Sequence, residues 1–180
     1  MRAVALFSVL LAGVLALATP AAAGVRMFSY DPANDLTRKV AGFLTFKFNQ
    51  RLIFVTILEI QSTEGQASAD LKPVDEHVLG HGGLNRLIGD RAQERDLYAV
   101  QPGDQGAEMI RAFCPGSTHA WLAFSHMAEA RPLRVQVIGD DASGGTRLCE
   151  TLDFNYHGEW SVPSGQSVRQ SQMLVPRFPY

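Results

Sequence analysis

The sequence predicts one exported α+β domain, built on an antiparallel sheet of five or six strands with two short helices on one face and one disulfide. Three observations predict this class: several segments of strand length separated by turn-forming residues, two short amphipathic stretches, and a pair of cysteines behind an export leader. The leader determines which residues enter the fold.

Residues 1–23, MRAVALFSVLLAGVLALATPAAA, have the three parts of a signal peptide. Arg2 supplies the positive start, an apolar run follows to Ala18, and three alanines at 21–23 provide the small residues that signal peptidase requires. The apolar run is shorter than the roughly 20 residues of a membrane-spanning helix. We expect cleavage before Gly24, a periplasmic or secreted location, and no membrane insertion of the mature chain.

The rest of the chain is long enough for one hydrophobic core, because a domain of about 150 residues buries some 68–70% of its unfolded surface. We expect a single globular domain over residues 24–160 and an extended or disordered tail over 161–180, where Ser, Gln and Pro are frequent. The formal net charge is −2, and loss of Arg2 makes it one unit more negative. This balance argues against a nucleic-acid partner, which requires a basic surface.

Strands are predicted where apolar residues alternate or where β-branched and aromatic residues form a run. Leu44, Phe46 and Phe48 alternate with polar residues, and the following run from Leu52 to Leu58 is apolar on both faces, so we expect these two strands to form a central hairpin. The other predicted strands are a short opening strand at Val25–Tyr30, an edge strand at Leu97–Val100, and a meander of Ala120–His126, Leu133–Ile138 and Arg147–Tyr156.

The middle of the chain, Ser62–Gly83, is polar and rich in glycine, so the sequence predicts a loop there. Two short helices should follow. Leu84, Leu87 and Ile88 have helical spacing, and Asp104 can cap a second helix that carries Ala107, Ile110 and Phe113 on one side.

Cys114 and Cys149 are predicted to form a structural disulfide. An exported chain meets an oxidising compartment, and the two cysteines lack the C-x-x-C spacing of a redox-active pair. Such a bridge would stabilise the fold by roughly 3–4 kcal/mol in the chain-entropy model.

His77 and His81 lie in the segment DEHVLGH, the single cluster of potential metal ligands in the sequence. They would share a face if the segment formed one helical turn, but the glycines at 80, 82 and 83 argue against that turn. A metal site would also need a further ligand, for which His119, His126 and His157 are candidates. A polar surface loop is the alternative.

Catalytic motifs are incomplete. His81-Gly82-Gly83 is similar to the oxyanion loop of some esterases, but the chain has no G-x-S-x-G nucleophile elbow. The glycine-rich segment 139–146 lacks the lysine of a phosphate loop and is expected to be a hairpin loop.

An outer-membrane barrel would need about eight strands, more than the sequence predicts. No cofactor is predicted.

The sequence therefore favours a soluble, non-catalytic exported protein that binds a small ligand or an envelope partner. The alternative is a small periplasmic hydrolase or a metal-binding protein that uses His77 and His81, with Asp75 or Glu76 as acid–base or ligand groups. For a binding protein, we expect the site in the Ser62–Gly83 segment or at the aromatic side chains of Trp121 and Trp160.

Overall fold

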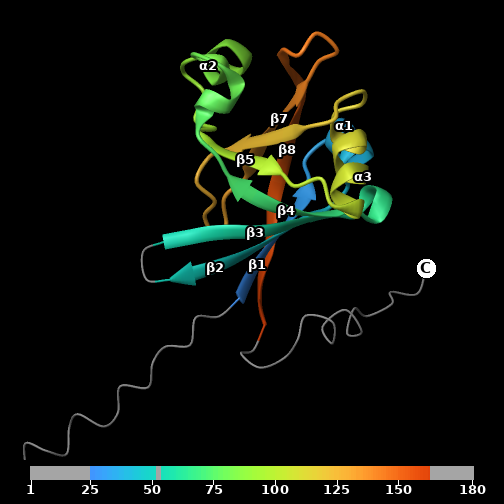
Figure 1. Cartoon of the computed structure of the whole chain (residues 1–180). Helices are drawn as coiled ribbons and strands as arrows, with labels where there is room; N and C mark the ends of the chain where they lie inside the picture. Colours follow the sequence, from blue (N-terminus) through green and yellow to red (C-terminus); the bar gives the residue numbers. More distant parts are fainter. Residues whose placement is uncertain (1–24, 52–53, 163–180) are drawn as a thin grey trace, which may run out of the picture.

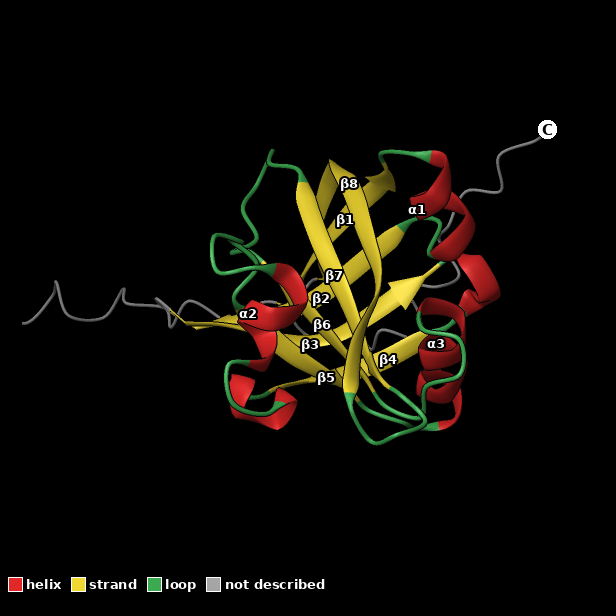
Figure 2. Cartoon of the chain, turned by 90° about the horizontal axis from the view of Figure 1, so that it is seen from above, coloured by secondary structure: helices red, strands yellow, loops and turns green. Residues whose placement is uncertain are grey.

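A computed structural model describes residues 25–51 and 54–162 (Figure 1). The predicted leader and its cleavage site, and the predicted tail beyond Val162, lie outside these residues. Eight antiparallel strands follow one another around a closed barrel, and the last strand pairs with the first (Figures 1 and 2). The prediction of an open sheet of five or six strands in an α+β fold is therefore wrong.

The elements follow one another in simple order along the chain. The strands are β1 (Val25–Pro32), β2 (Leu44–Arg51), β3 (Phe54–Ser62), β4 (Ser68–Pro73), β5 (Asp96–Val100), β6 (Ala120–Phe124), β7 (Leu133–Asp140) and β8 (Thr146–Val162). The α-helices are α1 (Asp35–Val40), α2 (Gly83–Ile88) and α3 (Asp104–Phe113), and the 3-10 turns are η1 (Glu64–Gln66) and η2 (Glu76–Leu79).

Two features of the sequence explain why closure of the barrel was not predicted. The predicted loop Ser62–Gly83 contains β4, in which Ala69 and Leu71 are buried while Asp70 and Lys72 point to solvent. The last strand runs 17 residues, past the predicted end at Tyr156, and its second half pairs with β1. Strand β4 connects β3 to β5, and the extension of β8 closes the barrel.

Because all neighbouring strands are antiparallel, successive connections alternate between the two ends of the barrel. One end carries α1, η1, α3 and the turn between β7 and β8. The other end carries the start of β1, the end of β8 and the connection from β6 to β7. We call this second end the mouth.

Aromatic side chains fill the inside of the barrel. Phe28 contacts Phe48 and Tyr156 edge to face, with ring centroids 4.7 and 5.6 Å apart, and these contacts lie toward the mouth. The ring contacts continue through Tyr30, Phe46, Phe124 and Tyr98. Edge-to-face and stacked rings add to the stabilisation from apolar burial, so this row is the centre of the core.

Helix α3 closes the end opposite the mouth. Its residues Met109, Ile110 and Phe113 are at most 2% exposed and belong to the same core cluster as the barrel interior. The helix begins after Gly103, which has no side-chain cap, so Asp104 is its first residue and not its cap. Helix α1, which was not predicted from the sequence, follows the N-cap Asn34, whose side chain accepts the Thr37 N–H.

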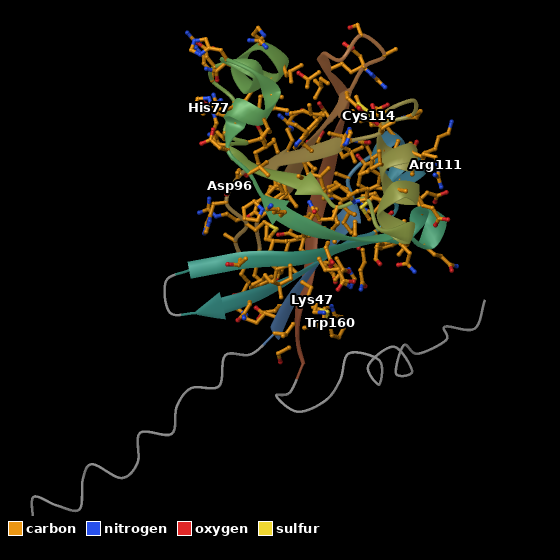
Figure 3. The ribbon with its side chains drawn as sticks, viewed as in Figure 1. Lys47, His77, Asp96, Arg111, Cys114 and Trp160 are labelled. Atoms are coloured by element: carbon orange, nitrogen blue, oxygen red, sulfur yellow. A yellow bond between two sulfur atoms is a disulfide. The ribbon has the colours of Figure 1, made fainter. Side chains whose placement is uncertain are left out.

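The predicted disulfide is confirmed. Cys114 follows α3, Cys149 lies on β8, and their Cα atoms are 5.3 Å apart. The register shifts so that Val137 faces Glu150 and Ile138 faces Leu148, which leaves Cys149 as the extra residue of a bulge. The bulge places Cys149 against the core beside Cys114, and the bridge thereby ties α3 to the barrel wall (Figure 3).

Helix α2 packs on the outside of the barrel. Together with η2 it covers a second apolar cluster formed by Leu79, Leu84, Leu97, Ala123 and Ile138, with Trp121 packed against it. The two predicted helices therefore lie in different places, α2 outside the wall and α3 against the interior, and not together on one face (Figure 2). In the described ranges, no helix combines the length and the apolar composition that crossing a membrane requires.

Candidate functional site at the barrel mouth

The mouth contains a hollow of about 250 Å³. One wall comes from the inner faces of β1 and β2, through Arg26, Phe28 and Phe48, and the other from residues 126–129 of the connection between β6 and β7. Small-ligand sites in proteins are concave, mostly apolar and often at barrel mouths. This hollow has that position and combines apolar with charged side chains, and its volume is below the usual range for such sites.

Strand alternation places the wall residues. Arg26, Phe28 and Tyr30 share the inner face of β1, and Phe48 lies on the inner face of β2. On β8 the register shifts after Tyr156, which pairs with Tyr30, so that Glu159 pairs with Phe28. Directly paired residues point to the same side of a sheet, so Glu159 and Tyr156 both reach the inside of the barrel near the mouth.

The charged centre of the mouth is Arg26. Its Nε and Nη2 atoms donate to the two carboxylate oxygens of Glu159, and the two side chains are about 32% and 24% exposed. Its guanidinium carbon also lies 5.6 Å from the ring centroids of both Phe28 and Phe48, within cation–π distance. The hydrogen bonds between the two groups raise the pKa of Arg26 and lower that of Glu159.

Glu129 adds a second carboxylate to the mouth. It belongs to the 126–129 wall, and its charge contributes to raising the pKa of Arg26, behind the hydrogen bond with Glu159. Burial raises the pKa of the Tyr156 phenol, and the charges of Glu129 and Glu159 add to that shift. Among the described residues, the Glu129 side chain has no hydrogen-bond or ion-pair partner. The mouth therefore combines ring faces with one paired and one unpaired carboxylate.

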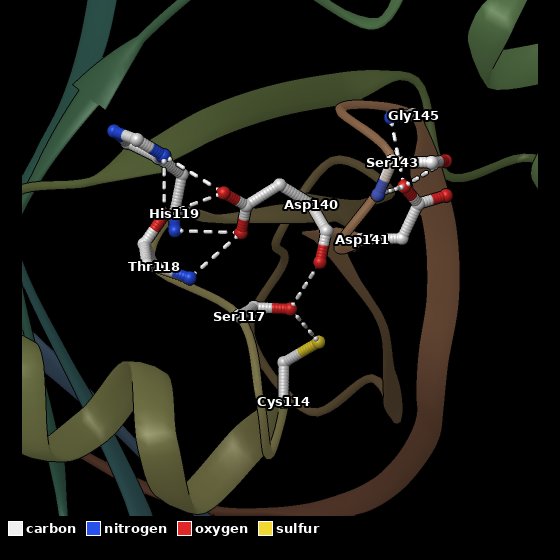
Figure 4. Close-up of polar contacts among 8 residues, drawn as sticks. All are labelled: Cys114, Ser117, Thr118, His119, Asp140, Asp141, Ser143 and Gly145. Carbon is white, nitrogen blue, oxygen red and sulfur yellow. Dashed lines mark hydrogen bonds and ion pairs between the residues drawn. The ribbon is translucent and has the colours of Figure 1, made fainter.

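A second polar cluster lies at the opposite end of the barrel, where β6 begins and β7 ends (Figure 4). Asp140 accepts the Thr118 hydroxyl at 2.6 Å and the backbone N–H groups of Thr118 and His119 at 2.8 Å each, and the His119 Nδ1 lies 3.0 Å away. These hydrogen bonds, chiefly that from the Thr118 hydroxyl, hold the Asp140 pKa far below its usual range.

Among the described residues, this His–Asp pair has no third member that would complete a catalytic arrangement. General-base catalysis needs a nucleophile within hydrogen-bond distance of the free ring nitrogen. Within the described residues, His119 forms hydrogen bonds through Nδ1 and its backbone, and no hydroxyl or thiol bonds to its Nε2. The neighbouring Ser117 hydroxyl instead donates to the Asp140 carbonyl at 2.7 Å and contacts Cys114. The cluster holds the 117–119 loop against β7, which is a structural role.

A polar hollow of about 400 Å³ lies outside the barrel, between β3, β4 and the start of α3. Three of its polar side chains, those of Glu59, Ser68 and Gln105, already have hydrogen-bond partners. Glu59 accepts from Lys47 at 3.2 Å and from Gln61 at 2.8 Å, and Ser68 donates to Gln105. Because these three groups already have partners and the lining offers no aromatic side chain, the mouth is the better candidate for a ligand site.

The predicted metal ligands are exposed on the outside of the fold. His77 lies in η2 beside Asp75, with its Nε2 3.6 Å from a carboxylate oxygen, and His81 lies in the turn before α2 (Figure 3). The other histidines are elsewhere: His119 beside Asp140, His126 at the mouth, and His157 3.0 Å from Asp31. Across residues 25–51 and 54–162, no three His, Cys, Asp or Glu side chains gather in a way that could hold a metal ion.

The two predicted aromatic binding residues are not brought together. Trp121 packs in the outer cluster beneath α2, with its ring 6.3 Å from that of His119. Trp160 lies on β8 near the mouth, is 56% exposed and pairs with Met27, whose side chain lies on the outer face of β1 (Figure 3). Neither residue lines the mouth hollow.

The residues of the mouth were not predicted from the sequence, although β1 carries a signal for them. Arg26 precedes Phe28 and Tyr30 at alternating positions, so a charged residue shares the face of two aromatic residues that the fold must bury. Such an arginine needs a partner in or near the core. The partner, Glu159, is 133 positions away, and no local pattern indicates it.

Comparisons of the chain with protein-family models, with curated proteins and with solved structures gave no match.

Proposed function

We propose that the protein is an exported, non-catalytic protein that binds a small ligand at the mouth of its barrel. The observation that carries the proposal is the hollow of about 250 Å³ lined by Phe28, Phe48 and Met127, with the ion pair of Arg26 and Glu159 at its wall. An apolar, concave lining with a few placed charges is the general composition of small-ligand sites.

Export rests on two features of the sequence. Residues 1–23 have the charged, apolar and small-residue regions of a cleaved leader, and the Cys114–Cys149 bridge suits an oxidising compartment. N-terminal sequencing of protein from the producing cell's envelope tests this part. A chain that begins at Gly24 supports it, and one that begins at Met1 contradicts it.

Binding at the mouth can be tested with a neutral probe, 2-phenylethanol, which carries one aromatic ring and no charge. The probe is titrated into isotope-labelled protein, in the form in which the full chain accumulates in the cell. It should shift the amide resonances of residues 126–129 and of Arg26, and these shifts should saturate. Ala128, a partly exposed member of the mouth wall, provides the test variant, because Ala128→Phe would fill the hollow.

The matched control is Ala142→Phe, at an exposed alanine in the turn between β7 and β8, at the other end of the barrel. We expect Ala128→Phe to abolish the saturable shifts and Ala142→Phe to leave them unchanged. Shifts that do not saturate, or that survive Ala128→Phe, would contradict binding at the mouth.

A further inference from the structure

The charges of the mouth do not cancel. Arg26 and Glu159 neutralise each other through two hydrogen bonds, and Glu129 remains as a carboxylate without a hydrogen-bond or ion-pair partner among the described residues. Counting His126 as neutral, the described side chains of the hollow, together with Glu159, sum to one net negative charge. A ligand that brought a carboxylate into it would face Glu129 and would compete with Glu159 for Arg26.

The apolar part of the hollow also favours a cation. The rings of Phe28 and Phe48 already have a guanidinium 5.6 Å from their centroids, so these rings are placed to interact with positive charge. Met127 adds a polarizable thioether to the opposite wall. A positively charged group beside Glu129 would gain a charge pair while the body of the same ligand lies against these rings.

The volume limits the ligand to a small molecule. A hollow of about 250 Å³ is below the usual range for drug-sized ligands, and a single ring with a short side chain suits it.

We infer that the mouth takes a small organic cation, with an aromatic or short alkyl body against Phe28 and Phe48 and an ammonium group at Glu129. This inference rests on the proposed function, because it names the ligand class of the same site. Arg26 and the ammonium group carry like charges and repel each other. The ammonium group therefore lies away from Arg26 and nearest to Glu129.

Three ligands that share one ring and differ in charge test the inference: 2-phenylethylamine, 2-phenylethanol and 3-phenylpropanoate. We expect the amine to bind the full chain about fivefold more tightly than the alcohol, and the acid to bind more weakly than both, as a partly exposed charge pair predicts. The amine's advantage should shrink in 1 M salt, because screening weakens a charge pair that solvent reaches.

The variant Glu129→Gln should remove the amine's advantage over the alcohol, so that the ratio of the two affinities falls from about five toward one. Glu108→Gln, at an exposed glutamate on α3, is the matched control and should leave all three affinities unchanged. Because the same ring is present throughout, a change confined to the amine isolates the charge.

The outcomes separate this inference from the proposed function. Equal affinity for the three ligands, or tightest binding of the acid, would overturn the inference and leave the mouth as a binding site. No saturable binding of any of the three would overturn both. An amine preference that Glu129→Gln does not reduce would overturn the assignment to Glu129.

Discussion

Arg26 at the start of the chain's first strand and Glu159 near the end of its last strand form a two-point ion pair inside the barrel mouth. The pair lies where β8 closes on β1, so one interaction contributes both to closure of the barrel and to the wall of the hollow. Removing it should therefore change stability and the charge of the site together.

Glu159→Gln is expected to lower the free energy of unfolding by about 1–2 kcal/mol, between the values for exposed and for buried ion pairs, because the pair is only partly exposed. Urea unfolding at pH 7 measures the change. Asp153→Asn, which breaks the more exposed pair with Arg134, should cost less than about 0.5 kcal/mol. An equal loss of unfolding free energy in both variants would show that the mouth pair stabilises the protein no more than the exposed pair does.

Asp140→Asn is expected to lower stability by about 2 kcal/mol at pH 7, because the charged carboxylate accepts several hydrogen bonds from the 118–119 backbone and side chains. The pKa of Asp140 is lower in the folded chain than in the unfolded one. Its stabilising contribution is therefore complete above the ordinary aspartate pKa of about 3.9 and is lost as the pH falls toward the folded pKa.

The gap in stability between the native chain and Asp140→Asn should accordingly narrow as the pH falls from about 5 to 2, measured by urea unfolding across that range. Asp90→Asn, in the exposed turn after α2, is the control and should show no such gap. A gap that stays constant with pH would mean that the carboxylate charge is not what stabilises this loop.

Replacing both Cys114 and Cys149 with serine is expected to cost about 3 kcal/mol, since the bridge closes a separation of 35 residues. The far-ultraviolet circular dichroism spectrum should keep the signal of the barrel, because the strands pair independently of the bridge. The same loss should follow reduction of the native chain with dithiothreitol. Unchanged thermal unfolding after reduction would contradict the role of the bridge in holding α3.

Gly106→Ala, within α3, should destabilise the protein even though alanine is the better helix former by about 1 kcal/mol. A Cβ at this position would overlap the carbonyl oxygen of Gln101, and backbone cannot move aside cheaply. Gly103→Ala is the control, because a Cβ there has open space around it. Thermal unfolding of the two variants measures the difference, and a higher melting temperature for Gly106→Ala would contradict the packing of α3 described above.

Local pattern predicted most of the elements. The β2–β3 hairpin, α2, β5, α3 and the meander of β6 to β8 appear near their expected positions, because each has clear alternation or helical spacing. Strand β4 has only two inward residues, Ala69 and Leu71, within a polar stretch, so its signal is too weak to separate it from a loop.

Closure and the mouth could not be predicted in the same way. Pairing of β1 with β8 joins the two ends of the domain, and the bulges that place Cys149 and Glu159 appear only when the strands are in register. The candidate site consists of residues from β1, β2, β8 and the 126–129 connection, so it exists only after closure. The histidines and tryptophans that the sequence indicated do not form one site: Trp121 packs beneath α2 beside His119, and His126 lies in the mouth wall.

The most direct test of the central claim is to locate a bound ligand by intermolecular nuclear Overhauser effects in the full chain saturated with 2-phenylethylamine. We predict contacts from the ligand ring to the Met127 methyl group and to the rings of Phe28 and Phe48, which line the hollow. Contacts confined to the outer surface, at Trp160 or in the polar hollow beside Glu59 and Gln105, would contradict a binding site at the barrel mouth.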